Sequence, residues 1–60
     1  MGKATVLVVE DELKLLKTLS DYLVINNYKV YQASDGLNGI QKYTAHREEI
    51  DLVLLDVMLP

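Results

Sequence analysis

Carboxylate side chains occur at two points of this 60-residue sequence, each directly after a run of apolar residues. Glu10, Asp11 and Glu12 follow the apolar residues 6–9, and Asp56 follows the apolar residues 52–55. Two like charges held 4 Å apart at an effective dielectric of about 20 repel by roughly 4 kcal/mol. Carboxylates brought together must therefore take up protons or bind a cation. Mg²⁺ is the natural ion, since it uses one or two carboxylates and completes its coordination with water and phosphate oxygens.

Both apolar runs are continuous rather than alternating, which is typical of parallel strands that are covered on both faces. A shorter and more polar strand is expected over residues 29–33, at the edge of the sheet. Residues 13–25 predict an amphipathic helix. Its apolar residues recur with helical spacing: Leu15, Leu16, Leu19, Tyr22 and Leu23.

Ser34, Asp35 and Gly36 predict a turn and the N-cap of a second helix. One face of that helical stretch is expected to contain Ile40, Tyr43, Arg47 and Ile50. The element order is then β-α-β-α-β. Right-handed crossovers allow a parallel sheet with strand order 2-1-3 and one helix on each face.

This topology places the two acidic points together. Open α/β sheets bind ligands beyond the carboxyl ends of their strands, at the point where the strand order reverses. Glu10 and Asp11 after the first strand would lie beside Asp56 at the end of the third. The sequence therefore predicts a carboxylate site for a divalent cation at this edge of the sheet.

Each of these residues also has a simpler interpretation. Glu10, Asp11 and Glu12 could serve only as carboxylates favoured near a helix N-terminus, and Glu12 is expected to do so. Asp56 lies between apolar segments, where an ionisable group is costly without a partner. The lone His46, among charged neighbours, is expected to be a solvated helix residue without a role.

Several other phosphate-handling families fit less well. A nucleotidase with an acidic strand end needs a G-x-x-x-x-G-K-[ST] loop, which this sequence lacks. Phosphatases of the haloacid dehalogenase type and toprim domains use a D-x-D pair, whereas the residue two after Asp56 is Met58. A flavodoxin would need a phosphate-binding loop after the first strand, where this sequence is acidic.

The amino-acid composition excludes several further classes of protein. The net charge of −3 argues against a nucleic-acid surface, and without cysteine any metal here would need oxygen ligands. The apolar runs are too short to cross a membrane, and the run after Val6 ends at Glu10, without the core of a signal peptide. We expect a cytoplasmic protein.

The sequence resembles the receiver domains of two-component response regulators and hybrid histidine kinases. The resemblance rests on VLVVEDE at residues 6–12, ASDG at residues 33–36 and DLVLLDVMLP at residues 51–60. It implies one half of a flavodoxin-like doubly wound fold. It also implies that Asp56 accepts a phosphoryl group from a sensor histidine kinase or phosphotransfer protein. Glu10, Asp11, Asp56 and the backbone carbonyl of Met58 would then bind Mg²⁺.

The resemblance ends with the sequence at Pro60, about halfway through the family pattern. The later strands of the family, which carry a Ser or Thr and a Lys of the site, are not matched. We therefore expect residues 1–60 to form a truncated receiver domain, its N-terminal half, that ends after the phosphoacceptor strand. It would be a phosphoryl-accepting signalling domain rather than an enzyme.

Two other functions stay open. A Mg²⁺-dependent phosphotransferase or phosphatase could use an aspartyl intermediate in the same crevice, or the chain could be an inactive self-associating fragment. The third strand would be a long apolar edge, which favours pairing with another chain. We expect self-association through this strand, with antiparallel pairing about a two-fold axis as one arrangement.

Overall fold

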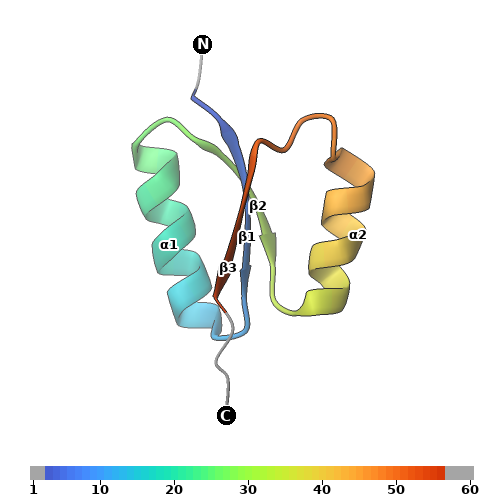
Figure 1. Cartoon of the computed structure of the whole chain (residues 1–60). Coiled ribbons are helices and arrows are strands. Elements are labelled where there is room, and N and C mark those ends of the chain that lie inside the picture. The colour runs from blue at the N-terminus through green and yellow to red at the C-terminus, as the bar shows by residue number, and fades with distance from the viewer. Residues whose placement is uncertain (1–2, 57–60) are drawn as a thin grey trace.

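The computed structural model describes residues 3–56 of the chain, and the side chains of residues 3–55. The elements follow one another as β1 (Thr5–Glu10), α1 (Leu13–Ile25), β2 (Lys29–Ala33), α2 (Gly36–His46) and β3 (Leu52–Asp56). The three strands form one parallel sheet in the order β2-β1-β3, with α1 and α2 on opposite faces (Figure 1). The predicted β-α-β-α-β fold and strand order are confirmed.

Strand β1 is the centre of the core, and all six of its residues are buried. Val6 and Val8 pack against Leu16 of α1 on one face of the sheet. Leu7 and Val9 pack with Ala33 on the other face. Burial on both faces explains why the apolar run is continuous, because each fully buried side chain stabilises the fold by about 1.5–3 kcal/mol.

Helix α1 matches its predicted bounds but not every predicted contact. Leu16 is buried, and Leu19 and Leu23 pack against the same cluster, whereas Tyr22 is 66% exposed. The prediction that Tyr22 belongs to the buried face was therefore wrong. After the helix, Asn27 adopts a φ of 70°, a left-handed conformation that asparagine tolerates better than most residues.

Helix α2 packs through a different face from the one predicted. Asp35 caps it as expected, since its Oδ1 accepts a hydrogen bond of 2.8 Å from the backbone N–H of Asn38. The buried residue, however, is Gly39, while Ile40 and Tyr43 are 66% and 47% exposed. A Cβ at Gly39 would lie 3.0 Å from Val9 Cγ2, so glycine lets the helix approach β1 closely.

The predicted face fails at its far end for a second reason. The helix ends at His46, so Arg47 is its C-cap and Ile50 lies in the loop that leads to β3. Ile50 instead packs against the core cluster of Leu7, Val9 and Ala33. A loop residue thus covers part of the sheet that we expected the helix to cover.

Strand β3 is fixed at its start but exposed along its length. Thr5 N–H donates to Asp51 Oδ2, and Asp51 N–H donates to Thr5 O, both at 2.8 Å. The four apolar residues that follow are 38–60% exposed: Leu52, Val53, Leu54 and Leu55. Both helices pack over β1 and β2, and neither packs closely against β3 within the described residues. The predicted apolar edge strand is confirmed. The expectation that this run, like that of β1, is covered on both faces was wrong, because neither helix extends over β3.

Candidate acidic site at the carboxyl edge of the sheet

Glu10 and Asp56 end neighbouring strands in register. They are paired positions of the parallel β1–β3 ladder, and neighbouring strands lie about 4.8 Å apart. Both helices begin at this same edge of the sheet (Figure 1). The juxtaposition predicted from the topology therefore holds for the backbone of these two residues.

The side chain of Glu10 lies inside the protein, with only 2% of the residue exposed. Its Oε2 accepts a hydrogen bond of 2.8 Å from the backbone N–H of Glu12. Burying a carboxylate costs free energy unless hydrogen bonds or a cation compensate it. The hydrogen bond from Glu12 N–H supplies part of this compensation. The bond also directs the carboxylate towards the loop between β1 and α1.

Asp11 and Glu12 form that loop, and both are exposed. Glu12 is the N-cap of α1, but its side chain makes no capping hydrogen bond. Glu12 therefore stabilises the helix only through its backbone and through its negative charge near the helix N-terminus. Asp11 lies between the buried Glu10 and the helix, with its carboxylate open to solvent.

Two predicted ligands, Asp56 and Met58, lie partly or wholly outside the described residues. Asp56 is placed by its backbone alone, and Met58 lies outside the described residues. Among the side chains of residues 3–55, no group of three or more acidic, histidine or cysteine residues has the spacing of a metal site. Glu10 and Asp11 are therefore the two predicted ligands whose side chains can be compared with the needs of an ion. Two carboxylates match what Mg²⁺ takes from proteins.

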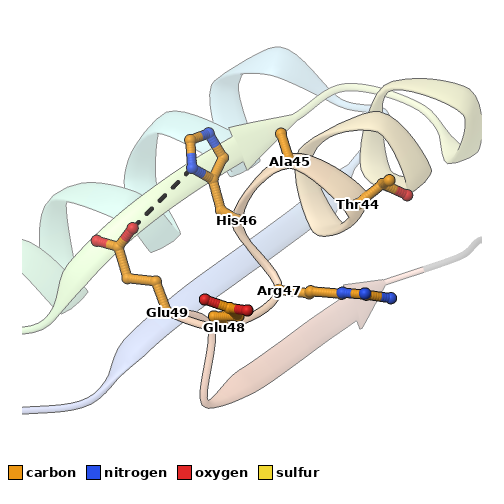
Figure 2. A pocket seen from close by; sticks show the side chains of 6 residues that line it. All are labelled: Thr44, Ala45, His46, Arg47, Glu48 and Glu49. Atoms are coloured by element: carbon orange, nitrogen blue, oxygen red, sulfur yellow. Dashed lines mark ion pairs between the residues drawn. The ribbon is translucent and has the colours of Figure 1, made fainter.

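A second polar cluster, which the sequence did not predict, lies at the edge strand β2. The ring of Tyr31 stacks on that of His46, with centroids 4.1 Å apart and planes 12° apart. Tyr31 Oη donates to Glu49 Oε2 at 2.8 Å, and Lys29 Nζ pairs with Glu49 Oε1. His46 Nδ1 lies 4.0 Å from Glu49 Oε2. A dashed line marks this pair in Figure 2. His46 is a partly exposed residue of α2, in line with the expectation of a solvated helix residue, but its contacts with Tyr31 and Glu49 were not predicted.

The charges of this cluster compensate one another. Hydrogen bonds from Lys29 and then from Tyr31 lower the pKa of Glu49 below its ordinary value. The same contact with Glu49 raises the pKa of Lys29. A pocket of about 370 Å³ lies beside the cluster and is lined by the end of α2 and the following loop, residues 44–49 (Figure 2). These contacts hold the loop against β2. The signal for them in the sequence is that Lys29 and Tyr31, two residues apart in a strand, lie on the same face of it.

No helix of the described residues has the length and apolar character needed to cross a membrane. The longest, α1, has 13 residues.

Comparisons with known proteins agree on one family. The family model of the response regulator receiver domain matches residues 6–60. The chain is 38% identical over 56 residues to the chemotaxis protein CheY of Treponema pallidum, and 42% identical over 55 residues to the response regulator ArlR of Staphylococcus aureus. Each match covers 92% of this chain, but only 39% of the chemotaxis protein and 24% of ArlR.

A solved structure supports the same assignment. The crystal structure of a response regulator receiver domain protein from Clostridium thermocellum matches with a TM-score of 0.89 and 31% sequence identity. The match covers 97% of this chain and 46% of the other. The chain thus spans less than half the length of the relatives that it matches.

Proposed function

The chain belongs to the response regulator receiver domain family, and from this membership we propose that Asp56 accepts a phosphoryl group from a histidine kinase or a phosphotransfer protein. The observation that carries the proposal is the register of Glu10 with Asp56. It brings the end of the strand that carries the acceptor beside a buried carboxylate and the acidic loop after β1. The carboxyl edge of a parallel sheet is also where such folds bind their ligands.

The transfer itself needs only one nucleophile from this chain. A carboxylate oxygen of Asp56 attacks the phosphorus of a phosphohistidine and forms a new oxygen–phosphorus bond. The phosphorus–nitrogen bond breaks, and its electron pair stays on the imidazole of the donor. The product is an aspartyl phosphate. The backbone of β3, held in register by β1, fixes the position of the acceptor residue.

We propose that Glu10, Asp11, Asp56 and the backbone carbonyl of Met58 hold Mg²⁺. The donor set fits this ion, because the side chains of Glu10 and Asp11 offer carboxylate oxygens, one buried and one open to solvent. Bound Mg²⁺ supplies positive charge that offsets the carboxylates and the phosphoryl oxygens. Glu10 is already held at the edge by its bond to Glu12 N–H, so little ordering is needed when the ion binds.

The chain is proposed to accept a phosphoryl group in a cytoplasmic signalling pathway, rather than to turn over a substrate. We also propose that it associates with itself through β3, whose apolar residues are exposed on the edge of the sheet. Proteins of this family act in two-component signalling.

The proposal is tested by the intact mass of the 60-residue chain after incubation with Mg²⁺ and acetyl phosphate, a small phosphoryl donor. We expect one phosphoryl adduct that requires Mg²⁺ and is absent from Asp56→Asn. Asp21→Asn is the matched control, because Asp21 is an exposed aspartate of α1 that pairs with Lys17.

Circular dichroism establishes that each variant is folded. A folded chain without an adduct would contradict acceptance by this chain. An adduct that persists in Asp56→Asn would place the acceptor elsewhere. Sustained release of phosphate from a phosphomonoester, in excess of the protein, would instead support a phosphatase.

A further inference from the structure

Asp51 directly precedes β3 and bonds to Thr5, the first residue of β1. Its Oδ2 accepts a hydrogen bond of 2.8 Å from Thr5 N–H, and its own N–H donates to Thr5 O at 2.8 Å. This pair and the pair of Glu10 with Asp56 are both separated by 46 positions in the sequence. Asp51 therefore bonds to the residue of β1 that the register of the ladder assigns to it.

The carboxylate of Asp51 completes the ladder at a point where the backbone has turned away. The N–H groups of Glu49 and Ile50 both donate to His46 O, so the chain just before Asp51 still belongs to the turn that ends α2. In a continued parallel ladder, a carbonyl of that segment would accept from Thr5 N–H. Asp51 Oδ2 takes this role instead. Thr5 is only 8% exposed, so water is a poor substitute for this acceptor.

The sequence of β3 specifies its register only weakly. Its first four residues are all apolar, and they are 38–60% exposed in the described part of the chain. A slipped strand would still place apolar side chains on both faces of the sheet, because the run does not alternate with polar residues. Ile50 packs against the core cluster next to the strand, but an apolar contact is not directional. A directional hydrogen bond at the start of the strand is therefore needed to select one register.

The register of β3 decides where the proposed phosphoacceptor lies. A strand rises about 3.3 Å per residue, so a slip of one residue would move Asp56 by that distance and turn it to the other face of the sheet. Reacting atoms must be held about 3–3.5 Å apart, and a misplacement of about 1 Å can slow a reaction about 100-fold. The bond at Asp51 can therefore control the reaction at Asp56 without contact with the phosphoryl group.

We propose that Asp51 is a positioning residue for phosphoryl acceptance: its carboxylate, bound to Thr5 N–H, selects the register that places Asp56 beside Glu10. This inference rests on the acceptor role proposed above for Asp56. Asp51 and Asp56 lie at opposite ends of β3, so Asp51 acts through the backbone of the strand. The role needs an acceptor oxygen rather than a negative charge. Asparagine should therefore replace Asp51, whereas alanine should not.

The first measurement is the register itself, followed by NMR of the isotope-labelled 60-residue chain without Mg²⁺ or phosphoryl donor. Through-space contacts between backbone protons of β1 and β3 report which residues are paired. We expect the unmodified chain and Asp51→Asn to show the contacts that pair Glu10 with Asp56. In Asp51→Ala these contacts should be weakened, or replaced by those of a shifted register.

The second measurement is the rate at which the phosphoryl adduct forms, per folded molecule, with Mg²⁺ and a range of acetyl phosphate concentrations. Asp51→Ala should lower the maximal rate at least about 10-fold, while the half-saturating donor concentration stays within about twofold. Asp51→Asn should keep the maximal rate within about threefold of the unmodified chain. Ile50→Val is the control for lost stability, since it removes one carbon from the neighbouring core cluster and leaves the hydrogen bond in place.

Hydrogen exchange covers the case in which Asp51→Ala does not fold. The Thr5 amide should exchange slowly in the unmodified chain, and Asp51→Asn should preserve this protection. Exchange at Thr5 as fast as that of an exposed loop amide would exclude the bond, and the proposal with it.

Three further results would overturn the proposal. An unchanged register and rate in folded Asp51→Ala would show that other contacts place the strand. A maximal rate as low in Asp51→Asn as in Asp51→Ala would assign the effect to charge. Equal slowing in Ile50→Val would assign it to stability. If the unmodified chain forms no adduct, the acceptor role of Asp56 fails, whereas the NMR contacts still decide whether Asp51 sets the register.

Discussion

Glu10 and Asp56 are paired residues at the carboxyl ends of the adjacent parallel strands β1 and β3. Residues 46 positions apart thereby meet across one strand spacing, and the pairing depends on the register of the whole ladder. A slip of β3 by one residue would no longer pair Glu10 with Asp56, and it would move each side chain of β3 to the other face of the sheet. The reciprocal hydrogen bonds between Thr5 and Asp51 fix this register at the opposite end of the strands.

The first prediction concerns the metal. Asp11→Ala should weaken Mg²⁺ binding at least about 10-fold, because this ion takes only one or two carboxylates from a protein. Glu12→Ala is the control, since Glu12 lies in the same exposed loop and makes no side-chain capping bond. Isothermal titration calorimetry of the folded chain with Mg²⁺ measures both affinities. Equal affinities for Asp11→Ala and the unmodified chain would remove Asp11 from the site.

A second prediction compares the two glycines of α2. A Cβ at Gly36 would meet nothing within 4 Å, so Gly36→Ala should stabilise the fold by about 0.5–1 kcal/mol through helix propensity. At Gly39 the added Cβ would lie 3.0 Å from Val9 Cγ2. Overpacking typically costs about 1–3 kcal/mol, which offsets or exceeds the gain. Urea denaturation should therefore rank Gly39→Ala below Gly36→Ala, and the reverse order would mean that α2 does not approach β1 this closely.

Ser20 supports a third prediction. Its Oγ is buried in α1 and has no hydrogen-bond partner among the described residues. Ser20→Ala should raise the free energy of unfolding by about 0.5–2 kcal/mol, because it removes a desolvated hydroxyl and improves helix propensity. Thr18→Ala is the control, since Thr18 is exposed and its Oγ1 donates to Lys14 O. If thermal unfolding shows no larger gain for Ser20→Ala than for Thr18→Ala, the hydroxyl of Ser20 has a partner.

The fourth prediction concerns pH. The contacts with Lys29 and Tyr31 lower the pKa of folded Glu49 below its ordinary value of 4.5. Glu49 therefore stabilises the fold fully above about pH 4.5, and this contribution is lost as the pH falls through the lowered pKa. In Glu49→Gln, the free energy of unfolding should depend less on pH in this acidic range.

The comparison for this prediction is Glu48→Gln. Glu48 is the exposed neighbour of Glu49 and has no ion pair in the described part of the chain. Denaturant titrations at several pH values between neutrality and the acid transition provide the free energies. Identical slopes for the two variants would show that the contacts of Glu49 do not persist in solution.

Much of the fold could be read from local sequence. The predicted strand of residues 29–33 and helix of residues 13–25 match β2 and α1, because their residue patterns are set by neighbours within one element. The apolar run of β1 correctly indicated burial on both faces. The N-cap role of Asp35 was equally local, since it depends on a few adjacent residues.

Apart from the end of α2 at His46, before Arg47 and Ile50, the errors concern contacts between elements. Ile40 and Tyr43 form an apolar stripe, yet α2 turns Gly39 to the sheet, because only a residue without a side chain fits against Val9 at that distance. His46 has charged sequence neighbours, yet it stacks on Tyr31 from another element. Helical spacing identifies an apolar side but cannot show which side the sheet has room for.

For the candidate site, the sequence alone determined which carboxylates follow which strands, and the rules of parallel topology brought those strand ends together. The tertiary structure decided that Glu10 is buried and bound to Glu12 N–H while Asp11 remains in solvent. It also decided that β3 keeps its apolar side chains exposed, because both helices settle over β1 and β2. Such differences depend on how whole elements pack against one another. This packing sets the solvent exposure of each side chain, and it cannot be read from a local sequence pattern.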